Sequence, residues 1–197
     1  MTEKEKRDAG LEYDANYDEA LIKEMTECKD KCFEYNSLRP SQAEEKSRLI
    51  KEILGKTKES VTIQAPFWCD YGYNIEVGEN FYANHNCVML DGAKITFGNN
   101  VFVAPDCGFY TAGHPIDIER RNKGIEYSHP ISVGDNVWIG GGVKVMPGVK
   151  IGSNVVIGGG SVVTRDIPDN VIAVGNPCRV LREITNQDLH KDYTWNK

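Results

Sequence analysis

His114 is the residue of this chain best suited to acid–base chemistry. It lies between Gly113 and Pro115, where a polar stretch begins, and the proline restricts the backbone of the histidine. An unperturbed imidazole titrates at about pH 6.5, so it can take a proton from a hydroxyl group at neutral pH. We therefore predict that His114 is a general base. The alternative is a loop histidine held by local hydrogen bonds, and position alone assigns such structural roles to His85 and His129.

The other histidines and the cysteines do not predict a metal site. The histidines stand at positions 85, 114, 129 and 190, so no two of them form a close pair in the sequence. The chain has six cysteines and no Cys-x-x-Cys pair; Cys28 and Cys32 are separated by one helical turn. No Gly-x-Ser-x-Gly segment is present either. We expect no metal cofactor, and direct attack by a bound hydroxyl group rather than a covalent enzyme intermediate.

Two glycine runs could bind an elongated anionic ligand. They occupy positions 140–142 and 158–160, and neither precedes the Lys-Ser/Thr of a phosphate-binding loop. Strips without side chains would let a ligand lie against backbone amides. Thr164, Arg165, Arg179 and Arg182 add polar and cationic groups toward the same end of the chain. A nucleotide head group could bind there, although solvated arginines and glycines required by a repeat explain the pattern as well.

Composition excludes several classes of protein. The chain has 197 residues and 22.0 kDa, with 23 basic and 29 acidic side chains and a net charge of −6, which argues against binding to duplex nucleic acid. No stretch approaches the roughly 18 apolar residues of a membrane span, and the charged start of the chain is not followed by the apolar core of a secretory signal. We therefore expect a cytoplasmic protein whose cysteines are reduced thiols.

The segment that precedes residue 60 has a helical pattern. Apolar side chains recur from Leu21 to Tyr35 along one stripe of a helix that begins near Asp18. The segment Ser41-Gln-Ala-Glu44 predicts a capping box for a second helix, which ends before Gly55. A helical hairpin that covers another part of the chain is the expected structure.

A period of six residues dominates the rest of the chain. Six consecutive rows begin at Val133, Ile139, Val145, Ile151, Ile157 and Val163. A helix would need a period of 3.6 and a simple strand a period of 2, whereas a row of six residues makes one short strand and one turn. Three rows then close one triangular coil of about 18 residues, with the first residue of each row pointing inward and Gly or Asn supplying positive φ angles at the corners. The pattern predicts a mainly β protein, a parallel β-helix of the hexapeptide type.

Similar rows occur earlier, with a two-residue offset before Phe97, and stop near Tyr110. The predicted organisation is a helical segment over 1–60, a β-helix over 61–178 with a long excursion loop at 111–132, and a C-terminal cap over 179–197. Loops of such length usually serve as lids or contact arms. Cys69, Cys87 and Cys107 are expected to stack as a ladder of thiols at one corner.

Several motifs resemble the maltose/galactoside O-acetyltransferases, the sugar branch of the hexapeptide acyltransferases. The resemblance covers nearly the whole chain and rests on the segments Ala9-Gly-Leu-Glu-Tyr-Asp14, Phe67-Trp-Cys-Asp-Tyr-Gly-Tyr-Asn-Ile75, Asn80-Phe-Tyr-Ala-Asn84, Thr111-Ala-Gly-His-Pro115, Val137-Trp-Ile-Gly140 and Gly175-Asn-Pro-Cys-Arg179. It implies a left-handed coil, a homotrimer with active sites between subunits, and transfer of acetyl from acetyl-CoA to a sugar hydroxyl, usually at the 6-position.

The resemblance also implies roles for individual residues. His114 would be the catalytic base, and the backbone N–H of Gly141, or else the Asn84 amide, would stabilise the oxyanion. The acceptor pocket would be lined by Asp14, Asp70, Asn84, Asp91 and Trp138. Coenzyme A would be contacted by Gly141, Gly159, Thr164, Arg165, Arg179 and Arg182. The segment Asp70-Tyr-Gly-Tyr-Asn74 is closer to the maltose branch, whereas Asp91-Gly92 stands where some relatives have two acidic residues.

Two other functions stay open at this point. One is a hexapeptide acetyltransferase that acts on a non-sugar acceptor, such as a xenobiotic or serine, and acceptor profiling would distinguish it. The other is a solenoid that serves as a non-catalytic scaffold, which would leave the His114-Pro115 loop without a role.

Overall fold

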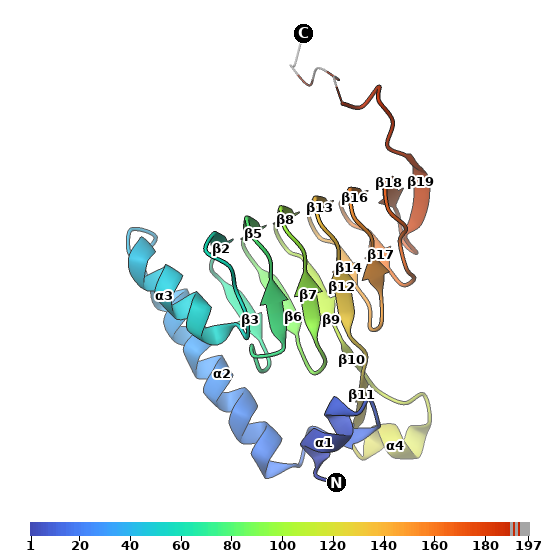
Figure 1. The fold of residues 1–197 in the computed structure, drawn as a ribbon. Coiled ribbons are helices and arrows are strands. Elements are labelled where there is room, and N and C mark those ends of the chain that lie inside the picture. Colours follow the sequence, from blue (N-terminus) through green and yellow to red (C-terminus); the bar gives the residue numbers. More distant parts are fainter. Residues whose placement is uncertain (190, 192, 194–197) are drawn as a thin grey trace.

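The computed structural model describes residues 1–189, 191 and 193, and it shows a parallel β-helix with helices along one end (Figure 1). Three parallel sheets form the faces of the prism. The first contains β4 (Ile75–Val77), β7 (Ile95–Phe97), β12 (Ile131–Val133) and β15 (Lys150–Ile151). The second contains β3 (Phe67–Cys69), β6 (Cys87–Leu90), β9 (Gly108–Tyr110), β14 (Lys144–Val145) and β17 (Val162–Val163). The third contains β2 (Val61–Ile63), β5 (Phe81–Ala83), β8 (Val101–Val103), β13 (Val137–Ile139), β16 (Val155–Ile157) and β18 (Val171–Val174), with the antiparallel β19 (Arg179–Glu183) at its edge.

The predicted coil of three rows is confirmed in the later turns. Ser132 pairs with Lys150, and Lys144 pairs with Val162, so these coils advance the chain by three rows of the repeat. The last coil is two residues shorter, since Val156 pairs with Ile172. The residues that begin the six rows are all buried, none of them more than 4% exposed. Positive φ angles at the corners occur at Asn136, Gly142, Gly148, Asn154 and Gly160, which confirms the expected use of Asn and Gly there.

Earlier turns are two residues longer, and always at the same corner. Val61 pairs with Phe81 and Ile75 with Ile95, so each partner stands two positions further along the chain than three rows would place it. The extra residues lie between the β3 and β6 strands of the second sheet and the β4 and β7 strands of the first. The excursion loop leaves the β-helix between β9 and β12, which belong to the same two sheets. Long connections therefore accumulate at one corner of the prism.

The excursion loop has secondary structure of its own. It contains β10 (Ala112–Gly113), α4 (Ile118–Asn122) and β11 (Ile125–Ser128). Strand β11 pairs antiparallel with β10 and also with β1 (Tyr13–Asp14). The loop is thereby attached to the N-terminal segment, which includes α1 (Glu3–Asp8), and Figure 1 shows α1, α4 and β11 together beside the prism.

The predicted helical hairpin is confirmed, with one correction at a helix start. Helix α2 (Glu19–Ser37) begins after Asp18, whose carboxylate accepts a hydrogen bond from the backbone N–H of Leu21. Helix α3 (Ala43–Ile53) follows, and buried side chains of both helices join the core of the first coils. The capping box at Ser41 is wrong, because Gln42 is the N-cap and its side chain instead accepts a hydrogen bond from the backbone N–H of Arg39.

The expected ladder of cysteines is only partly correct. Val88 pairs with Gly108, which places Cys87 beside Cys107 in the second sheet. Cys69 pairs with Met89 instead and contacts two cysteines of α2. The longer early coil explains the difference. Cys87 follows Cys69 by three rows, or 18 residues, whereas the strand partner of Cys69 stands two residues further along the chain, at Met89.

Strand β19 begins at Arg179, where the C-terminal cap was expected. Residues 190, 192 and 194–197 of that predicted segment, His190 among them, lie outside the described residues. Within the described part of the chain, none of the helices combines the length and apolar character that a membrane crossing requires.

Candidate active site

A cavity of about 560 Å³ opens at the corner where the long connections meet. Helix α2, strand β1, the excursion loop and the turns that follow β3 and β6 all contribute to its wall. The lining side chains include His114, Asp70, Glu126, Lys29 and Tyr13. An imidazole, two carboxylates, an ammonium and a phenol therefore surround one space, an arrangement suited to binding a polyhydroxylated molecule and moving one of its protons.

The imidazole of His114 has a defined orientation and tautomer. Its Nδ1 lies 2.9 Å from the carbonyl oxygen of Ile125, which can only accept a hydrogen bond. Nδ1 therefore carries the proton, and Nε2 keeps the lone pair that a base needs. Strand β10 ends at Gly113 and pairs with β11, so the backbone pairing that holds the loop also places the Ile125 carbonyl beside the ring.

Glu126 faces the other ring nitrogen. Its Oε1 is 3.9 Å from Nε2 of His114, and the glutamate side chain is 19% exposed. The phenol of Tyr13 donates a hydrogen bond of 3.1 Å to Oε2, which fixes the carboxylate. Burial raises the pKa of Glu126, while the hydrogen bond from Tyr13 lowers it. Once Nε2 has accepted a proton, the carboxylate can stabilise the resulting imidazolium.

Asp70 and Lys29 form an ion pair in the wall of the same cavity. Nζ of Lys29 is 3.4 Å from Oδ1 of Asp70, whose side chain is 19% exposed. Burial raises the pKa of Asp70, and the charge and hydrogen bond of Lys29 lower it. A carboxylate held in this way can accept hydrogen bonds from hydroxyl groups of a ligand.

Asp91 lies behind this wall and does not line the cavity, which departs from its expected place in the acceptor pocket. It is fully buried, and its Oδ1 accepts hydrogen bonds from the backbone N–H groups of Asp70 (3.0 Å) and Tyr71 (2.8 Å). Its Oδ2 accepts a longer one, 3.3 Å, from the backbone N–H of Asn74. The carboxylate is thus used to hold the turn that carries Asp70, and we assign Asp91 as a positioning residue.

Asp14 lies beside the cavity, between lining residues of β1 and the following turn. Its Oδ1 accepts hydrogen bonds from the backbone N–H groups of Asn16 (3.1 Å) and Tyr17 (3.0 Å). These bonds close the turn that brings Asn16 to the cavity. Asp14 is therefore near the predicted acceptor pocket, with one carboxylate oxygen committed to local structure.

The remaining predicted residues lie on other parts of the prism. Asn84 follows β5 and accepts a hydrogen bond from the backbone N–H of His85 through its side-chain oxygen. Trp138 is 56% exposed on the outer face of β13. Within one chain, neither these two residues nor Gly141 lines the cavity of His114.

The predicted coenzyme A residues share one end of the β-helix. Gly141 and Gly159 lie on neighbouring coils, since the backbone N–H of Gly160 donates to the carbonyl of Gly141. Thr164, Arg165 and Arg179 are exposed there, as is Arg182, whose guanidinium forms an ion pair of 2.7 Å with Asp188. A Cβ atom at Gly140 would lie 2.6 Å from the next coil, whereas at Gly141 its only neighbour within 4 Å is the Pro105 carbonyl oxygen at 3.5 Å. Packing thus explains Gly140 but not Gly141, and the exposed Gly141 backbone is open to a ligand.

Sequence reasoning missed Glu126, Lys29 and Tyr13. Glu126 was visible as one of several charges in the excursion loop, but only the pairing of β10 with β11 brings it to His114. Lys29 lies at the edge of the apolar stripe of α2, one turn after Met25, and nothing local in the sequence connects it with Asp70. The β1–β11 pairing brings Tyr13 to Glu126 although the two residues are far apart in the sequence, and no local sequence pattern predicts it either.

Replacing Glu126 with glutamine is expected to lower kcat by about tenfold to a hundredfold, a smaller effect than loss of the base itself. The amide keeps the size of the side chain and the contact with Tyr13, but it cannot stabilise an imidazolium by its charge. Steady-state kinetics at several pH values would show the loss in kcat with KM for the acyl donor unchanged. Equal kcat for Glu126→Gln and the wild type across the pH range would contradict this role.

Comparison with known proteins gives consistent matches along the chain. Residues 6–58 match a family described as the maltose acetyltransferase hexapeptide capping motif, and residues 130–165 match bacterial transferase hexapeptide repeats. A putative acetyltransferase of Saccharomyces cerevisiae is 60% identical over 176 residues, which cover 89% of this chain and 90% of the yeast protein. A putative acetyltransferase of Staphylococcus aureus is 52% identical, with 95% of this chain and 94% of that protein covered.

Solved structures agree with these matches. A maltose O-acetyltransferase from Clostridium difficile 630 superposes with a TM-score of 0.91 and 51% identity, covering 94% of this chain and 99% of that one. A galactoside acetyltransferase in complex with coenzyme A gives a TM-score of 0.94 and 42% identity, with both chains covered completely.

Proposed function

Because the chain belongs to the maltose/galactoside O-acetyltransferase family of hexapeptide-repeat acetyltransferases, we propose that it transfers acetyl from acetyl-CoA to a sugar hydroxyl. The acceptor is glucose, maltose or a related glycoside, and the site of acetylation is its 6-hydroxyl group. The observation that carries the proposal is the imidazole of His114, held with a basic Nε2 in a cavity that also contains Asp70 and Glu126.

The roles of the residues follow from this geometry. Nε2 of His114 takes the hydroxyl proton while the sugar oxygen forms a bond with the thioester carbonyl carbon. The oxyanion of the tetrahedral intermediate accepts a hydrogen bond from the backbone N–H of Gly141 or from the Asn84 amide, a contact worth roughly 3 kcal/mol. The carbon–sulfur bond then breaks, and the protonated His114 returns its proton to the departing sulfur. The products are the acetylated sugar and coenzyme A as its thiol.

Coenzyme A is proposed to lie along the glycine strip and the nearby cations. The exposed backbone at Gly141 and Gly159 would contact the extended part of the molecule. Thr164, Arg165, Arg179 and Arg182 would contact its phosphates and nucleotide, because guanidinium groups match phosphate oxygens well.

The proposal includes a homotrimer with active sites between subunits. It is supported by the distribution of the predicted residues, since Asn84, Trp138 and Gly141 lie outside the cavity of their own chain. A neighbouring copy could place these residues against His114. Exposed aromatic side chains on adjacent strands, Trp138 and its register partner Phe102, offer an apolar surface for such an association.

A cytoplasmic location is part of the same proposal. All six cysteines are free and buried in the structure, as expected for a protein that folds under reducing conditions.

Acceptor profiling tests the substrate class. Thiol release from acetyl-CoA is measured with glucose, maltose, a galactoside and no sugar, and the products are analysed by NMR. We expect sugar-dependent release clearly above the background with glucose or maltose, and acetylation at the 6-hydroxyl. If thiol were released only with a non-sugar acceptor such as serine, the protein would still be an acetyltransferase, but a sugar would not be its acceptor.

A further inference from the structure

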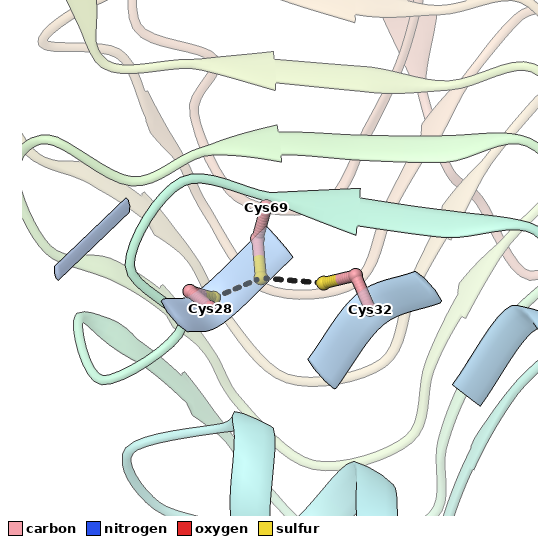
Figure 2. Close-up of side chains that lie close together, drawn as sticks. All are labelled: Cys28, Cys32 and Cys69. Atoms are coloured by element: carbon pink, nitrogen blue, oxygen red, sulfur yellow. Dashed lines mark hydrogen bonds between the residues drawn. The ribbon is translucent and has the colours of Figure 1, made fainter. Parts of the chain in front are cut away.

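Three buried thiols meet between helix α2 and strand β3 (Figure 2). Cys28 and Cys32 are one turn apart on α2, and Cys69 is the last residue of β3. The sulfur of Cys69 is 3.5 Å from that of Cys28 and 3.7 Å from that of Cys32, and all three sulfurs lie within 4.8 Å of one another. The residues are 5%, 0% and 1% exposed. No part of the proposed acetyl transfer uses them.

These spacings suit a metal ion better than a disulfide. With metal–sulfur bonds of about 2.3 Å, two sulfurs on one ion are about 3.8 Å apart in tetrahedral geometry and about 4.0 Å in trigonal geometry. The three thiols of Cys28, Cys32 and Cys69 therefore need only small shifts to share an ion. A disulfide would require two of the sulfurs to approach to about 2.0 Å and would leave the third unused.

A hydrogen-bonded contact beside the cluster supports its arrangement. One turn beyond Cys32, the side chain of Asn36 bonds the backbone N–H and carbonyl of Phe67 at 2.8 and 2.9 Å. This contact fixes α2 against β3 and thereby fixes the separation of the ligands.

A small cavity gives cations a path toward the cluster. It has a volume of about 200 Å³, and Cys28 lines it together with Glu24, Glu27, Glu52 and Lys31. The three carboxylates at its wall are each paired with a basic side chain: Glu24 with Lys4, Glu27 with Lys23 and Glu52 with Arg48. The cavity therefore offers access to Cys28 without a large excess of negative charge. The charge of Lys29, on the side of the His114 cavity, offsets part of the negative charge that three thiolates would bring.

We infer that Cys28, Cys32 and Cys69 form a binding site for one thiophilic d¹⁰ metal ion, Zn(II) or Cu(I). In the described part of the chain, no further His, Cys, Asp or Glu joins the group. Cu(I) accepts three sulfur ligands, whereas Zn(II) would add a water molecule as the fourth. Bound metal would connect α2 to β3 directly behind the Lys29–Asp70 pair, so the site would stiffen one wall of the His114 cavity.

The test uses the reduced full-length protein, treated with a chelator and then titrated without oxygen with Zn(II) or Cu(I) in separate experiments. Elemental analysis after gel filtration gives the stoichiometry, and competition with a chelator of known affinity gives the dissociation constant. We expect one ion per chain. Cys28→Ala and Cys32→Ala should each weaken metal binding by at least about 100-fold. Loss of a residue that only supports a ligand costs up to about 100-fold in metal affinity, and loss of a direct ligand should cost at least as much. Cys87→Ala, which removes an equally buried thiol of the core, should leave binding unchanged.

X-ray absorption spectroscopy of the loaded wild-type protein makes the test independent of the folding of any variant. Three sulfur neighbours alone indicate Cu(I) in the proposed site, and three sulfurs with one oxygen indicate Zn(II) there. The inference is overturned if neither ion binds to the folded wild type, or if the spectrum shows fewer than three sulfurs. Equal affinities for Cys32→Ala and Cys87→Ala would overturn it as well. None of these measurements depends on acetyl transfer.

Discussion

His114→Ala is expected to lower kcat by about two orders of magnitude or more while the affinity for acetyl-CoA stays nearly unchanged. The imidazole is held by the Ile125 carbonyl, so Nε2 is the basic atom that faces the cavity, and alanine leaves the sugar hydroxyl without a proton acceptor. The residues proposed to bind coenzyme A lie elsewhere on the prism. Sugar-dependent thiol release and acetyl-CoA binding by calorimetry, measured on the same preparation, separate the two effects.

His129→Ala is the matched control for this experiment. His129 is also exposed and also precedes a proline, but it does not line the cavity, and its ring contacts Tyr127 at a centroid distance of 5.1 Å. Its kcat should remain within about twofold of the wild type, as expected for a surface residue away from the reacting groups. Turnover that is unchanged in His114→Ala would remove this histidine from the mechanism.

The fold could be predicted because the period-six pattern is local and repeats. Each row needs one inward aliphatic residue and one corner residue that tolerates positive φ, and both recur in the sequence without reference to distant residues. The resemblance of six motifs to a known family supplied the rest, including the role expected of His114. The family and the β-helix can therefore be identified from the sequence alone.

The site was harder to predict because its walls come from distant parts of the chain. Tyr13 reaches Glu126 through the β1–β11 pairing, and Lys29 reaches Asp70 only because α2 lies against β3. No spacing along the chain encodes these contacts. The length of the early coils was also hard to predict. The sequence shows a two-residue offset once, before Phe97, whereas the structure has it in each early turn, and Cys69 is therefore displaced from the expected ladder of thiols.

The largest stability effect is expected at Asp91. Its carboxylate accepts hydrogen bonds from three backbone N–H groups in a fully buried position. Asp91→Ala leaves these donors without partners, at a cost of about 3 kcal/mol or more in the free energy of unfolding. For a chain of this length the melting temperature should fall by about 6–12 °C. Because the turn that carries Asp70 loses its support, kcat/KM for the sugar should fall too.

Asp91→Asn separates the hydrogen bonds from the charge. The amide oxygen can still accept from Asp70 and Tyr71, so stability at neutral pH should stay within about 1 kcal/mol of the wild type. KM for the sugar should be unchanged, whereas a direct sugar ligand would show a clear rise. A large increase in KM with normal stability would therefore return Asp91 to the acceptor pocket.

The pH dependence of stability gives an independent measure of the same residue. Burial, as the main cause, raises the pKa of Asp91 to about 6. The folded protein then holds a proton on this carboxyl that the unfolded chain has already released, since an unperturbed aspartate titrates at about 3.9. The Asp91 contribution is complete below about pH 4 and is lost as the pH rises through about 6. Denaturant unfolding at pH 4–7 should show that the free energy of unfolding of the wild type decreases as the pH rises, and that it decreases less in Asp91→Asn. If the two proteins gave parallel curves of stability against pH, the buried carboxyl would not change its protonation in this range.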